Sequence, residues 1–152
     1  MPALRTLRSA RLFCLTALAF AAAPLTALAA DDTCNLLTNA EITQATNDAV
    51  LHAAGVSKDC IWSGDKGRVY ITIRDASTWA SGKAQFQQYG GNIRPVSGVG
   101  DDAFFMGPGP TPTFYALKGA HFIILRVNVK GFSQDQNEAA MKSLATSALG
   151  RL

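Results

Sequence analysis

Two stretches of the chain alternate between apolar and polar residues, which is the pattern of half-buried β-strands. The apolar positions are Val69, Ile71 and Ile73 in the first stretch and Ile123, Leu125, Val127 and Val129 in the second. Because successive side chains of a strand point to opposite faces of its sheet, these positions are expected to bury one face. The other face then carries Tyr70, Thr72, Arg74, Phe122, Ile124, Arg126 and Asn128.

Turns that contain glycine place both strands in hairpins. Residues 60–63 and 68–74 flank the turn Gly-Asp-Lys-Gly at 64–67. The segment 113–131 turns at residues 118–120, where Gly follows Lys. Strand-forming runs separated by such short turns predict two β-hairpins.

Three segments carry helix signals. Thr38 with Glu41, and Ser133 with Gln136, have the spacing of a capping box, in which two side chains each bond the backbone N–H of the other residue. The first pair begins a short helix and the second begins a longer amphipathic helix. A third helix, within ASTWASGKAQFQQYGG, is predicted to be capped by Ser77 and ended by its pair of glycines.

The order of these elements predicts the fold class. Residues 103–106 add a strand after an extended piece that begins at Ile93, and residues 50–59, which contain Gly55, are predicted to be a connection. The order is then α-β-β-α-β-β-β-α. Because strands and helices do not strictly alternate, we expect an α+β fold with a single, mainly antiparallel sheet and the helices packed on one face.

The first thirty residues have the organisation of a secretory signal peptide. Three arginines precede an apolar run, which ends at residues 27–29 with the small-residue motif Ala-Leu-Ala. Pro24 interrupts the run, which is shorter than the roughly 20 residues that a transmembrane helix needs. We therefore expect residues 1–30 to be cleaved and residues 31–152 to form one domain, periplasmic or secreted, with no transmembrane segment left.

Cleavage changes the charge of the chain. The sequence has 14 basic and 11 acidic residues, but Arg5, Arg8 and Arg11 lie in the signal peptide, so 11 of each sign remain. No basic run survives in this formally neutral chain. Nucleic-acid-binding proteins carry a basic patch or stripe, so the composition argues against a nucleic-acid partner.

Two cysteines follow the signal peptide, Cys34 and Cys60. In an oxidising compartment such a pair persists as a disulfide, which here is expected to join the first helix to the first strand. A metal site would need further ligands at regular spacing, whereas His52 and His121 stand alone. We therefore predict a disulfide, no metal site and no cofactor.

The stretch GVGDDAFF, residues 98–105, has the glycines of a phosphate-binding loop but not its context. A strand, not a helix, follows the glycines, and two carboxylates directly after the glycines would repel a phosphate group. We instead expect Gly98 and Gly100 to adopt positive φ in a tight turn, with Asp101 or Asp102 bonding backbone amides of the same turn.

The segment 107–113 is predicted to be a surface loop. Pro108, Pro110 and Pro112 each lack a backbone donor, so the segment fits neither a helix nor a central strand. A loop of this kind is a candidate contact loop.

The motifs CNLLTNAEI, CIW and VSGVGDDAFF, followed by a final amphipathic helix, resemble a pattern in small exported bacterial proteins and lipoproteins of unknown function. That pattern reads C-x-L-L-T-x-x-E-I, C-x-W and G-x-G-D-x-A, and the resemblance covers most of residues 34–150. It implies a Cys34–Cys60 bridge and a compact α+β domain like that of the LpqN-type lipoproteins, with their PsbP-like fold. It implies no catalytic residues. The chain departs from the lipoprotein members because it lacks a lipid-attachment cysteine.

The polar face of the predicted sheet is the first functional candidate. Its candidate binding residues are Tyr70, Arg74, Phe122, Arg126 and Asn128. Aromatic residues mixed with arginines are typical of protein interfaces. Whether this face is open, or covered by a loop or by the second helix, the pattern leaves undecided.

Three hypotheses of function follow. The first is a non-enzymatic binding or accessory module of the bacterial envelope that acts through this face. The second is an inhibitor of a secreted or envelope hydrolase that inserts the loop 107–113. The third is a small hydrolytic enzyme, for which His121 and the pair Asp101 and Asp102 are the only usable groups. No catalytic constellation is recognisable, so we favour the first.

Overall fold

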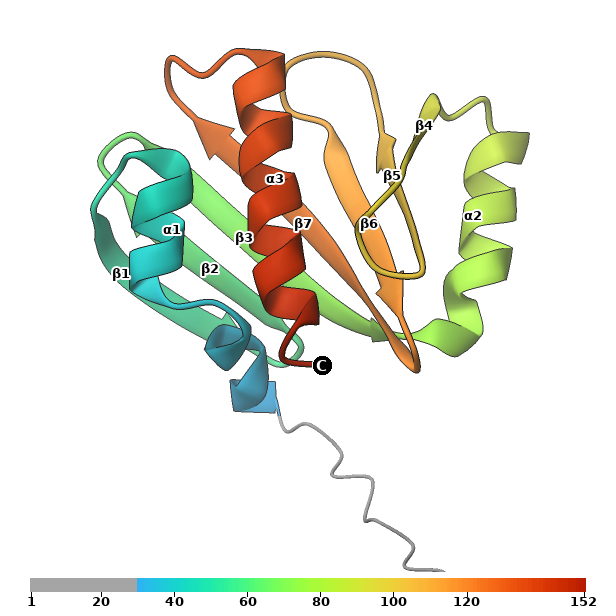
Figure 1. Cartoon of the computed structure of the whole chain (residues 1–152), viewed down its shortest axis with the longest axis horizontal. Coiled ribbons are helices and arrows are strands. Elements are labelled where there is room, and N and C mark those ends of the chain that lie inside the picture. Colours follow the sequence, from blue (N-terminus) through green and yellow to red (C-terminus); the bar gives the residue numbers. More distant parts are fainter. Residues whose placement is uncertain (1–29) are drawn as a thin grey trace, which may run out of the picture.

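The computed structural model describes residues 30–152, so the predicted signal peptide lies outside the described residues apart from Ala30. Within this range, seven strands form one antiparallel sheet in the order β1-β2-β3-β7-β6-β5-β4, accompanied by three α-helices (Figure 1). The strands are β1 (Val50–Val56), β2 (Asp59–Gly64), β3 (Gly67–Asp75), β4 (Ile93–Val96), β5 (Asp102–Met106), β6 (Thr113–Lys118) and β7 (His121–Val129). The helices are α1 (Asn39–Thr46), α2 (Trp79–Gln88) and α3 (Gln134–Leu149), with the 3₁₀ segments η1 (Ala30–Leu36) and η2 (Ala76–Thr78). None of the helices in the described part is long and apolar enough to cross a bilayer.

The α+β class with one mainly antiparallel sheet is confirmed, but the order of elements contains two additional strands, β1 and β4. The extended piece predicted from Ile93 forms β4, which pairs with β5. The predicted connection at residues 50–59 forms β1, which pairs with β2 from Val50 opposite Gly64 to Val56 opposite Asp59. Its sequence, VLHAAGV, lacks the apolar–polar alternation that marks β3 and β7. The edge of β2 supplies hydrogen-bond partners for its backbone, and this pairing outweighs the weak strand propensity of alanine and glycine.

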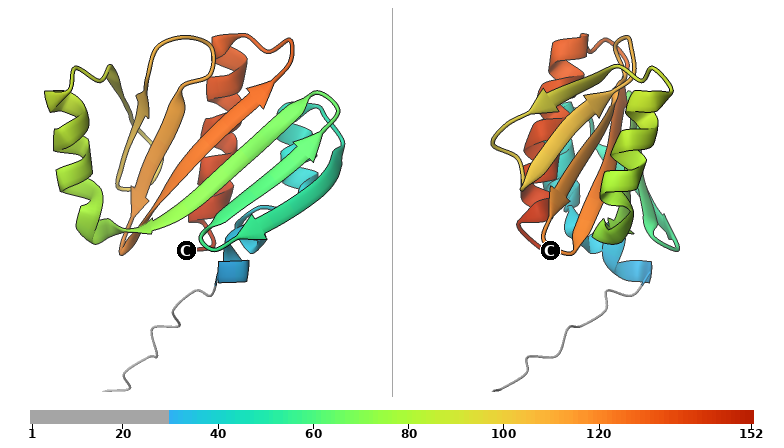
Figure 2. Two further views of the ribbon diagram at one scale, coloured as in Figure 1. Left: turned by 180° about the vertical axis from the view of Figure 1, so that it is seen from behind. Right: turned by 90° about the vertical axis from the view of Figure 1, so that its right-hand side faces the viewer.

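The pairing of β3 with β7 forms the centre of the sheet. Nine residue pairs join the two strands, from Gly67 opposite Val129 to Asp75 opposite His121. The face predicted to be apolar is buried beneath α1 and α3 (Figures 1 and 2). The core on this side includes Val69, Ile71, Ile73, Phe105, Phe114, Ile123, Leu125, Val127, Met141 and Leu144.

Helix α2 packs on the opposite face of the sheet, which differs from the expected placement of all helices on one face (Figure 2). The connection from β3 must pass β7, β6 and β5 to reach β4 at the far edge. Because α3 already covers the first face, the second is free for this crossing. The second apolar cluster, between α2 and the sheet, consists of Trp79, Phe104, Tyr115 and Phe122.

Both predicted capping boxes are present. The backbone N–H of Thr38 donates to Glu41 Oε2 at 2.8 Å, and that of Ser133 donates to Gln136 Oε1 at 2.8 Å. The threonine and serine hydroxyls accept the N–H groups of Glu41 and Gln136 in return. The two capping boxes thus satisfy four backbone N–H groups, two at the start of each helix, that have no partner within the helices.

The start of α2 differs from the prediction. Asp75, rather than Ser77, is the capping residue: its carboxylate accepts the backbone N–H of Ser77 at 2.8 Å at the start of η2. α2 itself begins at Trp79 without a side-chain cap. The short polar residues in this segment compete for the same role, so the sequence alone did not separate the 3₁₀ turn from the helix.

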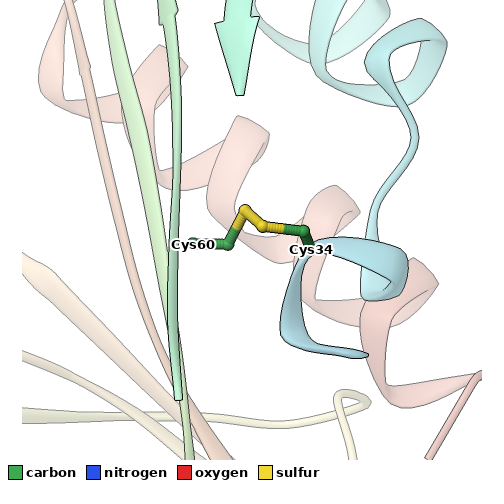
Figure 3. Close-up of a disulfide and its surroundings, with 2 residues drawn as sticks. All are labelled: Cys34 and Cys60. Atoms are coloured by element: carbon green, nitrogen blue, oxygen red, sulfur yellow. A yellow bond between two sulfur atoms is a disulfide. The ribbon is translucent and has the colours of Figure 1, made fainter. Parts of the chain in front are cut away.

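The predicted disulfide between Cys34 and Cys60 is confirmed (Figure 3). It joins η1 to β2, whereas the sequence suggested the first helix and the first strand. Gly55 of β1 lies opposite Cys60, and a Cβ at this glycine would lie 3.0 Å from the Cys34 sulfur. The glycine therefore leaves room for the bridge.

The carboxyl terminus closes over the amino-terminal segment through Arg151. Its guanidinium donates to Glu41 Oε1 at 2.8 Å and to the backbone carbonyl of Leu36 at 2.7 Å. The hydrogen bond from Arg151, more than those from Thr38, lowers the pKa of Glu41 from 4.5 to about 2, although burial acts in the opposite direction.

Removal of the disulfide by Cys34→Ala/Cys60→Ala is expected to lower the free energy of unfolding by about 3.5 kcal/mol. The reason is that the unfolded chain regains the entropy of a loop with a sequence separation of 26. Urea denaturation of the variant and the wild type measures the difference, and wild type with reductant should agree with the variant. A loss below about 1 kcal/mol would contradict this account.

Glu41→Gln is expected to destabilise the protein by about 1 kcal/mol at pH 7, because it weakens the capping box and the ion pair with Arg151. The folded-state pKa of Glu41 is lowered, so its contribution is present above pH 4.5 and is lost as the pH falls towards 2. The difference between wild type and variant should therefore shrink over this window. Urea denaturation at a series of pH values tests this, and a constant difference would sink the explanation.

Candidate binding groove

The second face of the sheet is divided into a covered half and an open half. The register of β3 and β7 brings Tyr70 opposite Arg126 and Arg74 opposite Phe122 on this face. Phe122 is buried beneath α2, whereas Arg74, Arg126 and Asn128 are exposed and Tyr70 is half-buried. In the left view of Figure 2, α2 lies at the β4–β5–β6 end of the sheet, while no helix lies in front of β1, β2 and β3 on this face.

The five residues predicted for the binding face therefore share one face, with Phe122 under the helix and the other four outside it. Their role in binding stays a prediction. The sequence left undecided whether this face is open or covered. The structure has it covered by α2 on one half and open on the other.

Two adjoining hollows occupy this face, and we call them together the central groove. One has a volume of about 680 Å³ and lies over β2, β3, β7 and β6, with Asp59, Tyr70, Thr113 and Arg126 in its lining. The other, of about 730 Å³, lies between α2 and the sheet and is lined by Trp79, Phe86, Phe104 and Phe122. Arg74, Tyr115 and Ile124 line both hollows, so the two are continuous.

The two arginines of the groove are held on opposite sides of it. Arg126 Nε donates to Thr113 Oγ1 on β6 at 3.0 Å. Arg74 Nη2 lies 3.8 Å from Asp59 Oδ1 on β2, and the Thr72 hydroxyl donates to that same oxygen at 2.5 Å. Among the described residues no carboxylate forms an ion pair with Arg126, so its outer nitrogens are available to an anion.

Aromatic rings form the wall of the groove under α2. Trp79 contacts Phe104 and Phe122 with ring centroids 5.3 and 5.2 Å apart, and Phe104 stacks on Tyr115 at 4.9 Å. Phe86 of α2 reaches Tyr115 at 5.4 Å. Burial raises the pKa of the Tyr115 phenol, which stays neutral and suits apolar or hydrogen-bonding contacts.

Asp102 attaches α2 to the sheet. Its Oδ2 accepts the indole N–H of Trp79 at 3.0 Å and the ammonium group of Lys83 at 2.6 Å. Burial raises the pKa of this carboxyl, but the hydrogen bonds from Lys83 and Trp79 outweigh burial and the net pKa is lowered. The carboxylate is thus ionised and bonded to the helix at neutral pH.

The two neighbouring aspartates serve separate purposes. Gly98 and Gly100 have the expected positive φ, 80° and 63°. Asp101, however, accepts the backbone N–H of Gly119 at 2.8 Å, in the turn between β6 and β7 and not in its own turn. With Asp102 bonded to α2, the expectation that one of them bonds amides of the same turn is corrected for both.

Of the groups proposed for hydrolysis, Asp102 and His121 point to opposite faces of the sheet, and Asp101 bonds the backbone N–H of Gly119. Asp102 lies opposite Leu117, which lies opposite Phe122, so these side chains share the face of α2. His121 precedes Phe122 in β7 and points to the other face. His52 lies in β1. Within residues 30–152 no three potential metal-ligating side chains form a cluster.

The candidate contact loop 107–113 borders the groove at one end. Pro108 and Pro110 are exposed, but Pro112 is buried. Asn137 of α3 donates its side-chain N–H to the carbonyl of Pro110 at 3.0 Å, so the second half of the loop is anchored. The residues of this loop that line the groove are Thr111 and Thr113, and not the prolines.

Sequence reasoning missed several residues of the groove, including Thr113, Tyr115 and Trp79. The run TFYA in β6 is apolar at successive positions, which hides its alternation. Trp79 was predicted to lie in a helix, but the sequence did not show on which face of the sheet that helix packs. Only the long-range order of the strands brings these residues beside Arg74 and Arg126.

No protein-family model, curated protein or solved structure matches this chain.

Asp102→Ala is expected to speed amide hydrogen exchange in α2 by at least about tenfold, because two charge-assisted hydrogen bonds to the helix are lost. The substitution removes the acceptor of both Trp79 and Lys83 while leaving the core under α3 intact. Hydrogen exchange followed by mass spectrometry measures the exchange of α2 and, for comparison, of α3. Asp101→Ala is the matched control because it removes only the bond to Gly119, and equal exchange of α2 in the two variants would refute the role of Asp102.

Proposed function

We propose that this protein is a non-enzymatic binding or accessory module of the bacterial envelope that recognises its partner through the central groove. The observation that carries the proposal is the pair of continuous hollows, about 680 and 730 Å³, beside the exposed Arg74 and Arg126. Ligand sites in proteins have volumes of about 300–1,000 Å³. Each of the two hollows therefore has the size of a ligand site.

The residue types of the groove support recognition of a partner. Tyrosine, tryptophan and arginine are the residues that contribute most to binding at protein interfaces. The half-buried Tyr70 supplies apolar area, the largely buried Tyr115 and Trp79 line the groove, and the two exposed arginines supply directional charge. The surrounding sheet is buttressed by the core under α3, so these side chains are presented on a rigid support.

The location in the envelope rests on the signal-peptide pattern of residues 1–30 and on the disulfide between Cys34 and Cys60. Disulfides persist in periplasmic and secreted proteins and are rare in the cytosol. The resemblance of the motifs to small exported bacterial proteins supports the same compartment. We propose export to the periplasm or the medium, without a lipid anchor.

The test is a crosslinked pull-down from envelope extract, with the chain from Asp31 as bait. We expect a partner that wild type captures and Arg74→Ala/Arg126→Ala loses. The matched control is Arg68→Ala/Lys130→Ala, which removes the same charge from exposed residues beside the groove but outside its two hollows. This control should retain the partner.

The outcomes separate the alternatives. If every partner survives loss of Arg74 and Arg126, the groove is not the recognition site. A secreted hydrolase captured equally by wild type and variant would favour the inhibitor that acts through loop 107–113. Hydrolysis abolished by His121→Ala together with Asp102→Asn would favour the enzyme.

A further inference from the structure

We infer that the central groove binds an extended acidic peptide with carboxylates four residues apart and an apolar side chain midway between them. This inference rests on the proposed function and names the chemistry of the partner. It follows from the register of β3 and β7, from the anchoring of the two arginines and from the distribution of carboxylates in the described residues.

The register sets the spacing of the two positive charges. Arg126 lies opposite Tyr70, and Arg74 lies four residues further along β3, opposite Phe122. At about 3.3 Å per residue, their Cα atoms are separated by about 13 Å along the strands. An extended peptide places side chains i and i+4 on the same side at this same spacing.

The anchoring of the arginines disfavours a single small anion. Arg126 is directed to Thr113 on β6, and Arg74 is directed to Asp59 on β2, so the guanidinium groups lean to opposite sides of the groove. One carboxylate or phosphate group cannot contact both in this arrangement. Two separate carboxylates on one ligand can, and an extended chain that crosses the strands obliquely supplies them.

The floor between the arginines is apolar. Ile124 and Thr72 face each other midway between the two arginine positions, and Tyr115 adjoins Ile124 on β6. Ile124 and Tyr115 line both hollows, where the groove passes from its arginine-bordered part to its aromatic part. The peptide residue at i+2 points to this floor, so an apolar or aromatic side chain is the complementary choice.

The net charge of the face complements an acidic partner. Arg68, Arg74 and Arg126 project from β3 and β7 on this side, and Lys66 and Lys130 lie next to Arg68. The carboxylate in the lining of the groove is Asp59, which already accepts the Thr72 hydroxyl. An anionic segment is therefore attracted, and the attraction should weaken with salt.

The experiment measures fluorescence anisotropy of the labelled peptide Gly-Glu-Ser-Phe-Ser-Glu-Gly with the chain from Asp31. We expect saturable binding at low salt that weakens about tenfold when both glutamates become glutamine. A peptide with one serine deleted, which brings the carboxylates to i and i+3, should bind more weakly than the original. Arg74→Ala and Arg126→Ala should each weaken binding about two- to fivefold.

Two protein variants make the test specific. Arg68→Ala removes an arginine from the same face outside the two hollows, and it should weaken peptide binding less than Arg74→Ala or Arg126→Ala does. Arg126→Glu should bind a peptide in which one glutamate is replaced by lysine better than wild type does. Both residues are exposed, so neither change threatens the fold.

Absence of saturable binding, equal affinity for the glutamine peptide, or equal affinity for the i and i+3 spacing overturns the inference. The proposed function fails separately, when the pull-down does not depend on Arg74 and Arg126. Binding of an acidic oligosaccharide such as oligogalacturonate, with no binding of the peptide, would overturn the inference that the ligand is a peptide. The groove would remain the recognition site.

Discussion

The antiparallel pairing of β3 with β7 is the constraint on which the rest of the structure depends. It joins the meander β1–β2–β3 to the meander β4–β5–β6–β7. Because side chains alternate with a period of two, the register that buries Ile71 against Leu125 also sets Tyr70 beside Arg126 on the other face. A slip by one residue would bury the arginines and expose the core. The burial of one face thus determines the arrangement of the groove on the other.

The crossing of α2 divides the second face into its two halves. The chain leaves the sheet at the centre, after β3, and returns at the far edge, as β4, so the connection that contains α2 must pass β7, β6 and β5. Its own sequence gives it little stability, since Gly82 lies in its middle and it has no side-chain cap. The aromatic cluster around Trp79 and the bonds to Asp102 hold it in place. A weakly formed helix thereby becomes the wall of the groove.

Local patterns predicted the parts of the fold that local physics controls. The alternation around Ile71 and Leu125, the capping boxes at Thr38 and Ser133 and the glycine turns were all readable along the chain. β1 was missed because its strand character comes from the edge of β2, and the face of α2 was missed because it depends on which face α3 leaves free. For the groove, the sequence predicted the residues of β3 and β7 but not Tyr115 or Thr113, which only the order of strands brings alongside.

The charge of the groove follows from how the chain uses its carboxylates. Beyond the predicted signal peptide the two signs are equal in number, yet many acidic side chains are engaged in maintaining the fold. Asp48, Asp75 and Asp101 accept backbone N–H groups in turns and at a helix start. Glu41, Asp102 and Glu138 pair with Arg151, Lys83 and Arg94 away from the open half of the sheet. Arg68 and Arg126 lack such partners among the described residues, so residues 31–152, although formally neutral, present a locally cationic face. Total charge alone therefore conceals the feature that makes an acidic partner the complementary one.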